Sequence, residues 1–331
     1  MHNSDEYYMR VALAHGQRGL GNTAPNPAVG CVIVKDDRIL GVGHTSPGGR
    51  PHAEVNALKQ AAFEAKDADA YVTLEPCSHT GQTPPCCDAL IKAGIKRVII
   101  GCTDPDPRVS GQGIERLKAA GISVVTNCLE AECLKSNKGF FLKINEKRPY
   151  VCLKVASSQD HMIAAKEGAR TQISGKMAAR YTHNLRSYYD AIMVGSETFL
   201  IDNPQLTTRL EGYEHNIKRY ILDGSGRIQD AMQGFNIITD KVVDTRNISA
   251  VLSYLAEQGI TRLLVEGGAR LHESFLESGM VDEFQHIQSH NVIGNEGVCA
   301  SYLNKPTSFG LDKFKSRSLG DDRLDIYKRA S

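Results

Sequence analysis

Strand-like and helix-like segments alternate twice along the chain, and a polar stretch at 145–149 lies between the two series. Apolar runs rich in Val and Ile, bounded by Gly, Pro, Asn or Asp, are typical of strands, and helical spacing of apolar residues separates many of these runs. At 331 residues the chain also exceeds what a single core usually accommodates. We therefore expect an α/β protein with two domains, residues 1–145 and 150–331.

The expected elements give each half enough strands for a sheet of its own. The first half has expected helices at 6–19, 52–66, 85–94, 113–121 and 130–145, a hairpin at 29–43, and strands at 70–76, 96–104 and 122–126. The second half has expected strands at 150–157, 190–196, 218–223, 235–240 and 261–268, helices at 175–189, 248–259 and 269–279, and strand-like segments near the end.

The charge balance and the cysteines exclude several classes of function. The 39 Lys and Arg against 38 Asp and Glu give a net charge of +1, which is not typical of nucleic-acid-binding proteins. No apolar run approaches the roughly 20 residues of a membrane helix, and the polar MHNSDEYYMR does not resemble a signal peptide. Nine cysteines, an odd number, favour a reducing compartment. We expect a cytoplasmic protein with a small-molecule substrate, no nucleic-acid partner and no membrane contact.

Two stretches of the first half contain the residue types of a catalytic zinc site: HAE, which starts at His52, and EPCSHTGQTPPCC, which starts at Glu75. Cys86 opens an expected helix behind two prolines, where the free N–H groups of the first turn favour a thiolate. One imidazole and two thiolates, from His52, Cys77 and Cys86, make a zinc site with a fourth position for water. Glu54 suits proton transfer from that water. The pattern is that of the zinc nucleobase deaminases, although eight residues separate the two cysteines where two are usual.

Simpler interpretations exist for several of these residues. Cys87 would point about 100° round the helix from Cys86, so we assign Cys86 to the metal and Cys87 to the core. His79, between the cysteines, is expected to be a loop residue. Asn26, in APNPAVG, is either a turn former or an amide that faces a base. A core of buried cysteines without metal is the alternative for the whole pattern.

The second half has one local signal for ligand binding. The expected strand TRLLVE is followed by Gly267 and Gly268 and then by a helix, so backbone N–H groups could approach a phosphate there. An ordinary tight turn is the alternative. Arg186 and Arg209 have forked guanidinium groups that suit a phosphate, although surface arginines are usually solvated. No G-x-G-x-x-G occurs, so a Rossmann dinucleotide fold is not indicated.

The chain closely resembles the bifunctional deaminase/reductase family of riboflavin biosynthesis, most strongly in TAPNPAVGCVIV, GGRPHAEVNAL, TLEPCSHTGQTPPCCDALI and DPDPRVSGQGIERLKAAGI. The resemblance covers essentially the whole chain. It implies a cytidine-deaminase-like domain followed by a dihydrofolate-reductase-like domain. The family's zinc ligands and proton shuttle match the residues named above, and Asn26 and Asp104 match positions near the pyrimidine. The implied substrate is a diaminopyrimidinone that carries a ribosylamine 5′-phosphate.

For the second half the resemblance rests on LKVASS, LRSYYDAIMVGSETFLIDNPQLTTR and LLVEGGARLHESFL, and it implies NADPH as cofactor. The positions that match cofactor contacts are Ala156, Gln172, Thr198, Asp202, Gly267 and Gly268, and those that match substrate contacts are Arg170, Arg186, Leu206, Arg209 and Glu266. The chain departs from the family's S-L-D-G at Gln159 and His161, where His in place of Gly costs strain at a positive φ. It departs from S-x-W-I-T at Arg170 and Gln172, and it contains no Trp.

The leading hypothesis is therefore zinc-dependent deamination followed by NADPH-dependent reduction of the ribosyl group. One alternative is an RNA-editing adenosine deaminase, which shares H-A-E. A second is a deaminase whose divergent second domain only binds or oligomerises. A purely structural zinc module is the non-enzymatic alternative. A homo-oligomer is compatible with an enzyme of this size.

Overall fold

The computed structural model describes residues 3–107, 109–166, 171–213, 215–228 and 234–330. The chain divides into two compact units, Met1–Glu146 and Lys147–Ser331, and the division falls inside the polar stretch 145–149. Each unit has its own sheet and its own core, so the expected α/β architecture is confirmed. No helix among the described residues is both long and apolar enough to cross a membrane.

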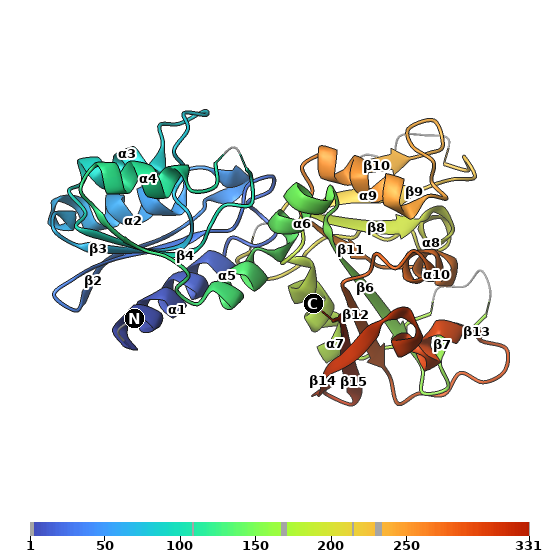
Figure 1. Cartoon of the computed structure of the whole chain (residues 1–331). Coiled ribbons are helices and arrows are strands. Elements are labelled where there is room, and N and C mark those ends of the chain that lie inside the picture. Colours follow the sequence, from blue (N-terminus) through green and yellow to red (C-terminus); the bar gives the residue numbers. More distant parts are fainter. Residues whose placement is uncertain (1–2, 108, 167–170, 214, 229–233, 331) are drawn as a thin grey trace. The chain divides into compact units, whose positions relative to one another are not determined.

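The first unit is a mixed five-stranded sheet covered by helices on both faces. The strands are β1 (Gly30–Lys35), β2 (Arg38–His44), β3 (Asp69–Leu74), β4 (Arg97–Cys102) and β5 (Ser123–Val125), in the order β2-β1-β3-β4-β5. The helices are α1 (Asn3–Gln17), α2 (Ala53–Ala61), α3 (Cys86–Lys92), α4 (Gln112–Ala119), α5 (Glu130–Ser136) and α6 (Lys138–Glu146), with 3-10 turns η1 (Pro47–Gly49) and η2 (Ala62–Ala65). Figure 1 shows α2, α3 and α4 on one face of the sheet and α1 and α5 on the other.

The strand pairing follows from the pattern of apolar residues. The hairpin expected at 29–43 is confirmed, with β1 antiparallel to both β2 and β3. Strands β3, β4 and β5 are parallel, and the near-continuous burial of β3 and β4 matches their unbroken apolar runs. Two expected helices are interrupted. The helix expected at 52–66 ends at Ala61, where Ala62 has φ of 50° and a 3-10 turn follows. The single helix expected at 130–145 is two helices. Asn137 leaves helical geometry between α5 and α6, with φ of −103° and ψ of 19°.

The packing of α2 on β2 sets the position of the α2 N-terminus. Gly41 and Gly43 of β2 face the helix, and a Cβ at Gly43 would overlap the carbonyl oxygen of Ala53. Because neither glycine has a side chain, the backbone of α2 lies directly against the strand. His52, the residue before α2, is held in place by this contact.

The second unit contains a mixed eight-stranded sheet in the order β10-β9-β8-β11-β6-β12-β15-β14 and a small sheet of β7 and β13. The strands are β6 (Tyr150–Ser157), β7 (Met162–Ala164), β8 (Ala191–Gly195), β9 (Lys218–Leu222), β10 (Phe235–Ile238), β11 (Arg262–Val265), β12 (Glu283–Gln288), β13 (Val298–Cys299), β14 (Leu311–Leu319) and β15 (Asp322–Arg329). The helices are α7 (Lys176–Arg186), α8 (Ser196–Asp202), α9 (Ile248–Glu257) and α10 (Ala269–Glu277), with 3-10 turns η3 (Ser301–Asn304) and η4 (Pro306–Phe309).

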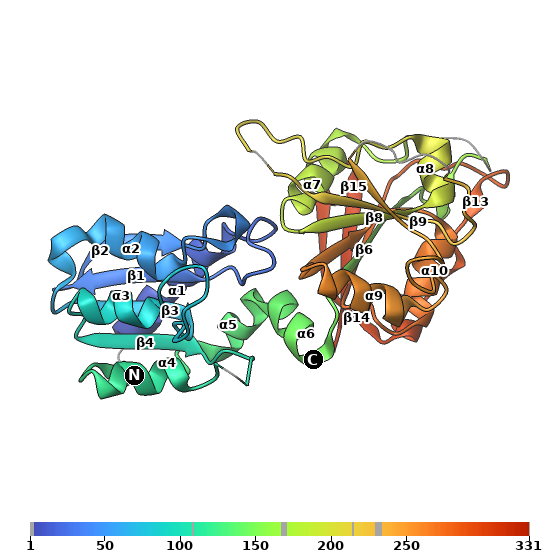
Figure 2. The ribbon, with the colours of Figure 1, turned by 90° about the horizontal axis from the view of Figure 1, so that it is seen from above.

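Both faces of the large sheet are covered. Val151, Leu153 and Val155, alternate residues of β6, share one core with α9 and α10. Ala178 of α7 packs against Ile287 in a second cluster on the opposite face. Figure 2 shows α7 on one side of the strands and α9 and α10 on the other. Sequence analysis missed α8, whose residues SETFLID show no clear helical spacing of apolar side chains.

We predict that Gly43→Ala lowers the free energy of unfolding of the first unit by about 1–3 kcal/mol, the usual cost of overpacking. It should also weaken zinc retention, because the displaced α2 carries His52. Thermal unfolding and metal analysis measure the two effects. Gly81→Ala is the matched control, since its Cβ would meet no atom closer than 3.4 Å. Equal stability and equal zinc content in both variants would contradict the prediction.

Candidate active sites

Three side chains of the first unit converge on one point. The ligand atoms of His52, Cys77 and Cys86 all lie within 4.8 Å of one another. Nδ1 of His52 is 3.3 Å from Cys86 Sγ and 3.7 Å from Cys77 Sγ. A tetrahedral zinc about 2.3 Å from sulfur and 2.0–2.1 Å from nitrogen places its ligand atoms roughly 3.5–3.8 Å apart. The three donors therefore fit zinc with little rearrangement.

Three different segments supply these donors. His52 precedes α2 in extended conformation, Cys77 comes three residues after β3 ends, and Cys86 begins α3 directly behind Pro85. The backbone N–H of Cys86 donates to Cys77 Sγ at 3.3 Å. The free N–H groups at the start of α3 thus stabilise negative charge on sulfur.

Cys87 points away from the cluster. Its thiol donates to the Pro76 carbonyl at 3.3 Å, and its side chain is buried in the core of the first unit. His79 is exposed in the loop between the cysteines. The structure thus brings Cys86, and not Cys87, together with His52 and Cys77.

Glu54 is the second residue of α2 and is only 4% exposed. Burial raises its pKa to about 7, and the negative charge of Cys77 acts in the same direction. A carboxyl group with such a pKa both accepts and returns a proton at neutral pH. A hydrogen bond from the Cys86 thiol lowers the pKa of Cys77 to about 4, and the same shared proton raises the pKa of Cys86.

Asn26 and Asp104 are the two residues matched to pyrimidine contacts. Each is hydrogen-bonded to a segment that carries His52 or leads to Cys77. Asn26 Nδ2 donates to the carbonyl of Gly49 at 2.9 Å, three positions before His52. Asp104 lies in the loop after β4, where its carboxylate accepts from the N–H of Asp106 at 2.8 Å. Burial raises the pKa of Asp104.

Glu75 is a residue that the sequence analysis missed. Its carboxylate is 4% exposed and accepts backbone N–H groups from Asp104 at 3.2 Å, Gly111 at 3.0 Å and Gly113 at 2.9 Å. It therefore holds the Asp104 loop against the segment that leads to Cys77. The sequence contained one signal for this role, an acidic residue directly after an apolar strand. A carboxylate buried at that place requires several hydrogen-bond donors.

The second unit contains a partly buried ion pair between Arg186 of α7 and Glu266, which follows β11. Arg186 Nε and Nη2 donate to the two carboxylate oxygens at 2.8 and 2.9 Å, and Nη1 donates to the Thr207 carbonyl at 2.9 Å. Although burial opposes it, the positive charges of Arg186 and Lys154 lower the pKa of Glu266 to about 2. The N–H groups of the Arg186 guanidinium are thus bonded to other residues of the protein. This supports a role for Arg186 in orienting Glu266, and not in binding a phosphate.

Arg209 is exposed and lies close to α7. Its Nη1 donates to Gln205 Oε1 at 2.6 Å, and its Nη2 lies 3.2 Å from His183 Nε2. Leu206 lies between Gln205 and Arg209 in the sequence. Its side chain is buried, and its φ is 52°. The sequence analysis missed His183, although its position three residues before Arg186 puts both on one helix face.

The turn from β11 to α10 is tightly packed. Gly267 and Gly268 have φ values of 141° and 76°, which favour glycine. Thr198 of α8 covers them, and a Cβ at Gly267 would lie 2.8 Å from Thr198 Cγ2. The Gly267 N–H donates to Nε2 of buried His272 at 3.2 Å. The turn is therefore a cradle without side chains at the start of a helix, which suits a phosphate-bearing cofactor.

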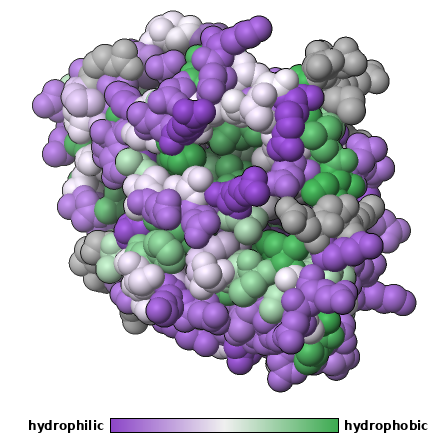
Figure 3. Space-filling view, turned by 90° about the vertical axis from the view of Figure 1, so that its right-hand side faces the viewer, coloured by the Kyte–Doolittle hydropathy of each residue, from purple (hydrophilic) through white to green (hydrophobic). Residues whose placement is uncertain are grey.

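The other residues matched to cofactor contacts lie on separate segments. Asp202 is the last residue of α8, Ala156 pairs with Ile287 across β6 and β12, and Gln172 is exposed between β7 and α7. Arg170 lies outside the described residues. Figure 3 shows apolar side chains in the middle of the face that carries α8 and α10, with polar side chains around them.

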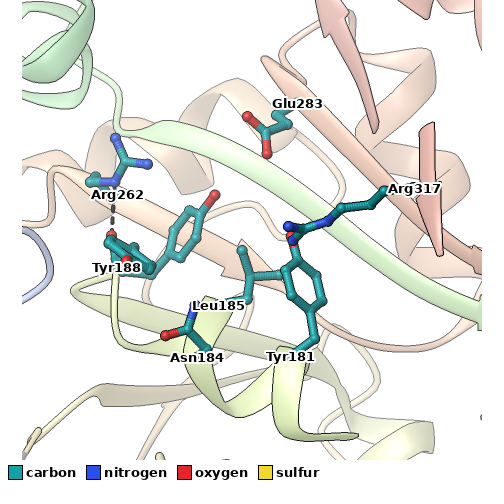
Figure 4. A pocket seen from close by; sticks show the side chains of 8 residues that line it. Tyr181, Asn184, Leu185, Tyr188, Arg262, Glu283 and Arg317 are labelled. Carbon is teal, nitrogen blue, oxygen red and sulfur yellow. Dashed lines mark hydrogen bonds between the residues drawn. The ribbon is translucent and has the colours of Figure 1, made fainter. Parts of the chain in front are cut away.

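A cavity of about 250 Å³ lies beside the C-terminal end of α7. Figure 4 shows Arg262 there, donating to the Tyr188 carbonyl at 2.8 Å. The Arg262 guanidinium also stacks over the rings of Tyr150 and Tyr189. The cavity is lined by Tyr181, Asn184, Leu185, Tyr188, Tyr189, Arg262, Glu283 and Arg317, and none of these was singled out by the sequence.

Both halves of the chain match known families. Residues 2–102 match the zinc-binding region of cytidine and deoxycytidylate deaminases, and residues 149–322 match the RibD C-terminal domain. The chain is 37% identical to the riboflavin biosynthesis protein RibD of Aquifex aeolicus, over 98% of each chain. It is 36% identical to RibD of Escherichia coli, over 96% of this chain and 97% of the relative.

Solved structures agree over the full length. Acinetobacter baumannii RibD matches with a TM-score of 0.88 and 34% identity, over 99% of both chains. The Thermotoga maritima diaminohydroxyphosphoribosylaminopyrimidine deaminase/5-amino-6-(5-phosphoribosylamino)uracil reductase also matches with a TM-score of 0.88 and 34% identity, over 98% of this chain and 99% of that one. The expected deaminase-like and reductase-like folds are thereby confirmed. The chain belongs to the RibD family and is a bifunctional riboflavin biosynthesis enzyme, with a zinc-dependent deaminase domain followed by an NADPH-dependent reductase domain.

Proposed function

We propose that His52, Cys77 and Cys86 hold the zinc, and that Glu54 moves protons in the deamination of a diaminopyrimidinone ribosylamine 5′-phosphate. The observation that carries this proposal is a buried carboxyl group beside a cluster of three zinc-type donors in one domain. The Thermotoga maritima relative is named as a deaminase and reductase of such phosphoribosylaminopyrimidines.

Glu54 is the proton carrier of the first reaction. Zinc in such a site acidifies water to a pKa of roughly 7 and so supplies hydroxide at neutral pH. Glu54, whose pKa burial raises to about 7, takes one proton from the water and delivers it to the ring nitrogen. It then moves a second proton, from the newly added hydroxyl group, to the leaving amine, which departs as ammonia while the ring carbonyl forms.

Asn26 and Asp104 orient the pyrimidine in this proposal. Their connections to Gly49 and Glu75 support it, because each hydrogen bond couples a ring contact to a segment that bears a zinc ligand. A half-buried amide and a half-buried carboxyl group match the donor and acceptor pattern of an aminopyrimidinone edge.

In the second domain we assign positioning of the substrate to Leu206, Arg209 and Glu266, with Arg186 acting through Glu266. Arg170 is carried as a family match outside the described residues. NADPH supplies the hydride that reduces the ribosyl group to ribityl. We assign its contacts to Ala156, Gln172, Thr198, Asp202, Gly267 and Gly268. With a pKa near 2, Glu266 stays negative at neutral pH and fixes Arg186 and Lys154 around the site. Catalysis of this kind is mainly positioning.

We also propose that the enzyme acts in the cytoplasm, without a nucleic-acid or membrane partner. The net charge of +1 and the nine free cysteines support this. The alternative of an RNA adenosine deaminase gains no support, because the second domain matches a reductase family.

The positions named above at which the sequence departs from the family lie in the second domain. His161 adopts φ of 64°, and its Nδ1 is buried without a hydrogen-bond partner among the described residues. Gln172 is exposed and supplies no aromatic surface. Mass spectrometry of the product separates the two functions: deamination adds about one mass unit, and reduction with NADPH adds about two more.

We predict that Cys86→Ser weakens zinc binding at least ~10-fold, because a hydroxyl is a poorer zinc ligand than a thiolate. Cys87→Ser is the matched control and should retain zinc, since its side chain faces Pro76. Metal analysis after dialysis against a chelator measures both. Loss of zinc from the Cys87 variant alone would reverse the assignment.

We predict that Glu54→Gln keeps zinc but slows deamination by at least ~10²-fold, the usual contribution of a general acid/base. Ammonia release measures the rate. Glu64→Gln, on an exposed neighbour in η2, should be neutral. Near-normal turnover by the Glu54 variant would remove this residue from the mechanism.

We predict that Glu266→Gln reduces the rate of NADPH oxidation with deaminated substrate by at least ~10-fold, because it leaves the partly buried Arg186 without its counter-charge. Deamination should be unchanged. Exposed Glu257→Gln serves as control. Equal rates of NADPH oxidation by the Glu266 variant and the unaltered protein would contradict this role of Glu266.

A further inference from the structure

Arg50 lies at the rim of the zinc cluster, two residues before His52, and has no role in the chemistry described so far. Its Nη1 donates to Thr83 Oγ1 at 2.7 Å and lies 3.3 Å from His52 Nε2. Its Nη2 lies beside Gly81, where an added Cβ would meet it at 3.4 Å. The guanidinium therefore bridges the segment before α2 and the loop before α3, which both supply zinc ligands.

Zinc binding frees part of this guanidinium. His52 faces the two sulfurs with Nδ1, and a neutral imidazole that binds metal through Nδ1 carries its proton on Nε2. Two donors do not hydrogen-bond to each other. The contact between Arg50 and Nε2 therefore does not persist as a hydrogen bond once His52 is a ligand, and that N–H of Arg50 becomes available to a third group.

The positive charge of Arg50 is not neutralised by a neighbour. Within the described parts of the chain, no carboxylate lies within ion-pair distance of Arg50, whereas Arg116 pairs with Asp88 at 2.6 Å. Arg116 also contacts the same loop, through the Ser78 carbonyl at 2.8 Å. A half-buried guanidinium with open donors suits a phosphate, which accepts a forked pair of N–H groups.

We propose that Arg50 and the Thr83 hydroxyl bind the 5′-phosphate of the deaminase substrate, an inference that rests on the proposed function. The leaving amine must face the zinc and Glu54, so the ribosylamine phosphate extends away from the metal. Arg50 contacts Nε2 of His52, on the ring edge opposite to the sulfurs. Its positive charge therefore lies about one imidazole ring farther from the sulfurs than Nδ1 does. Thr83 accepts from Arg50 and keeps its own O–H for a phosphate oxygen.

The test compares two substrates, the ribosylamine 5′-phosphate and the same compound without phosphate, with the zinc-loaded full chain. Arg50→Gln should lower kcat/KM for the phosphorylated substrate ~10- to 100-fold, the scale of lost charge-assisted hydrogen bonds. It should leave kcat/KM for the dephosphorylated substrate and the zinc content unchanged. Arg50→Lys should recover part of the loss, and Arg116→Gln, which removes a charge already paired, should act normally on both substrates.

Three results would overturn the proposal. Equal losses on both substrates would mean that Arg50 supports the fold of the site, and loss of zinc would mean that it acts through His52. No loss on either substrate would mean that the phosphate binds elsewhere. Failure of the unaltered protein to deaminate either substrate would instead refute the proposed function, so the two failures are distinguishable.

Discussion

The deaminase site depends on the close approach of α2 to β2. Without side chains at Gly41 and Gly43, the helix backbone rests on the strand, and the N-terminal end of α2 presents His52 and Glu54. The sulfur donors come from the other side, where the N–H of Cys86 fixes Cys77 at 3.3 Å. Zinc tolerates only small changes in ligand distance, so a shift of the helix would separate donors that the loop alone cannot bring back.

Two acidic residues to which we assign roles, Glu54 and Glu266, have pKa values that are shifted in opposite directions. Glu54 and Glu266 are both shielded from water, yet the pKa of Glu54 is about 7 and that of Glu266 about 2. Burial raises the pKa in both cases, and Cys77 adds negative charge beside Glu54. Arg186 and Lys154 surround Glu266 with positive charge and reverse the effect. The first carboxyl group can therefore carry protons at neutral pH, while the second is a permanent negative charge that orders cations.

The parts that the sequence predicted well are those encoded by local spacing. His52, Glu54 and the two cysteines lie near helix starts and a strand end, where pattern and chemistry coincide. Contacts between distant segments were not predictable in the same way: Glu75 and Gly113 are 38 positions apart, and Arg186 and Glu266 are 80 apart. No local pattern predicts such partners, because a Glu or Arg on its own resembles an ordinary surface charge and the donor in Gly113 is a backbone N–H. Helix α5 was misjudged for a related reason, since the exit of Asn137 from helical geometry overrides a continuous apolar spacing.

The turn after β6 indicates how the reductase domain accommodates its departures. His161 has the positive φ that a glycine would adopt freely, and histidine is among the residues that tolerate this region best. Hydrogen bonds around Asp160 hold the turn in this shape. The Ser158 hydroxyl donates to the Asp160 carboxylate, which also accepts the N–H groups of Ile293 and Gly294 at 3.1 and 2.7 Å. Together these bonds lower the pKa of Asp160 to about 2. The shape of the turn thus depends on the carboxylate more than on the residue that replaced glycine, which argues that the substitution alone does not abolish the fold of the cofactor domain.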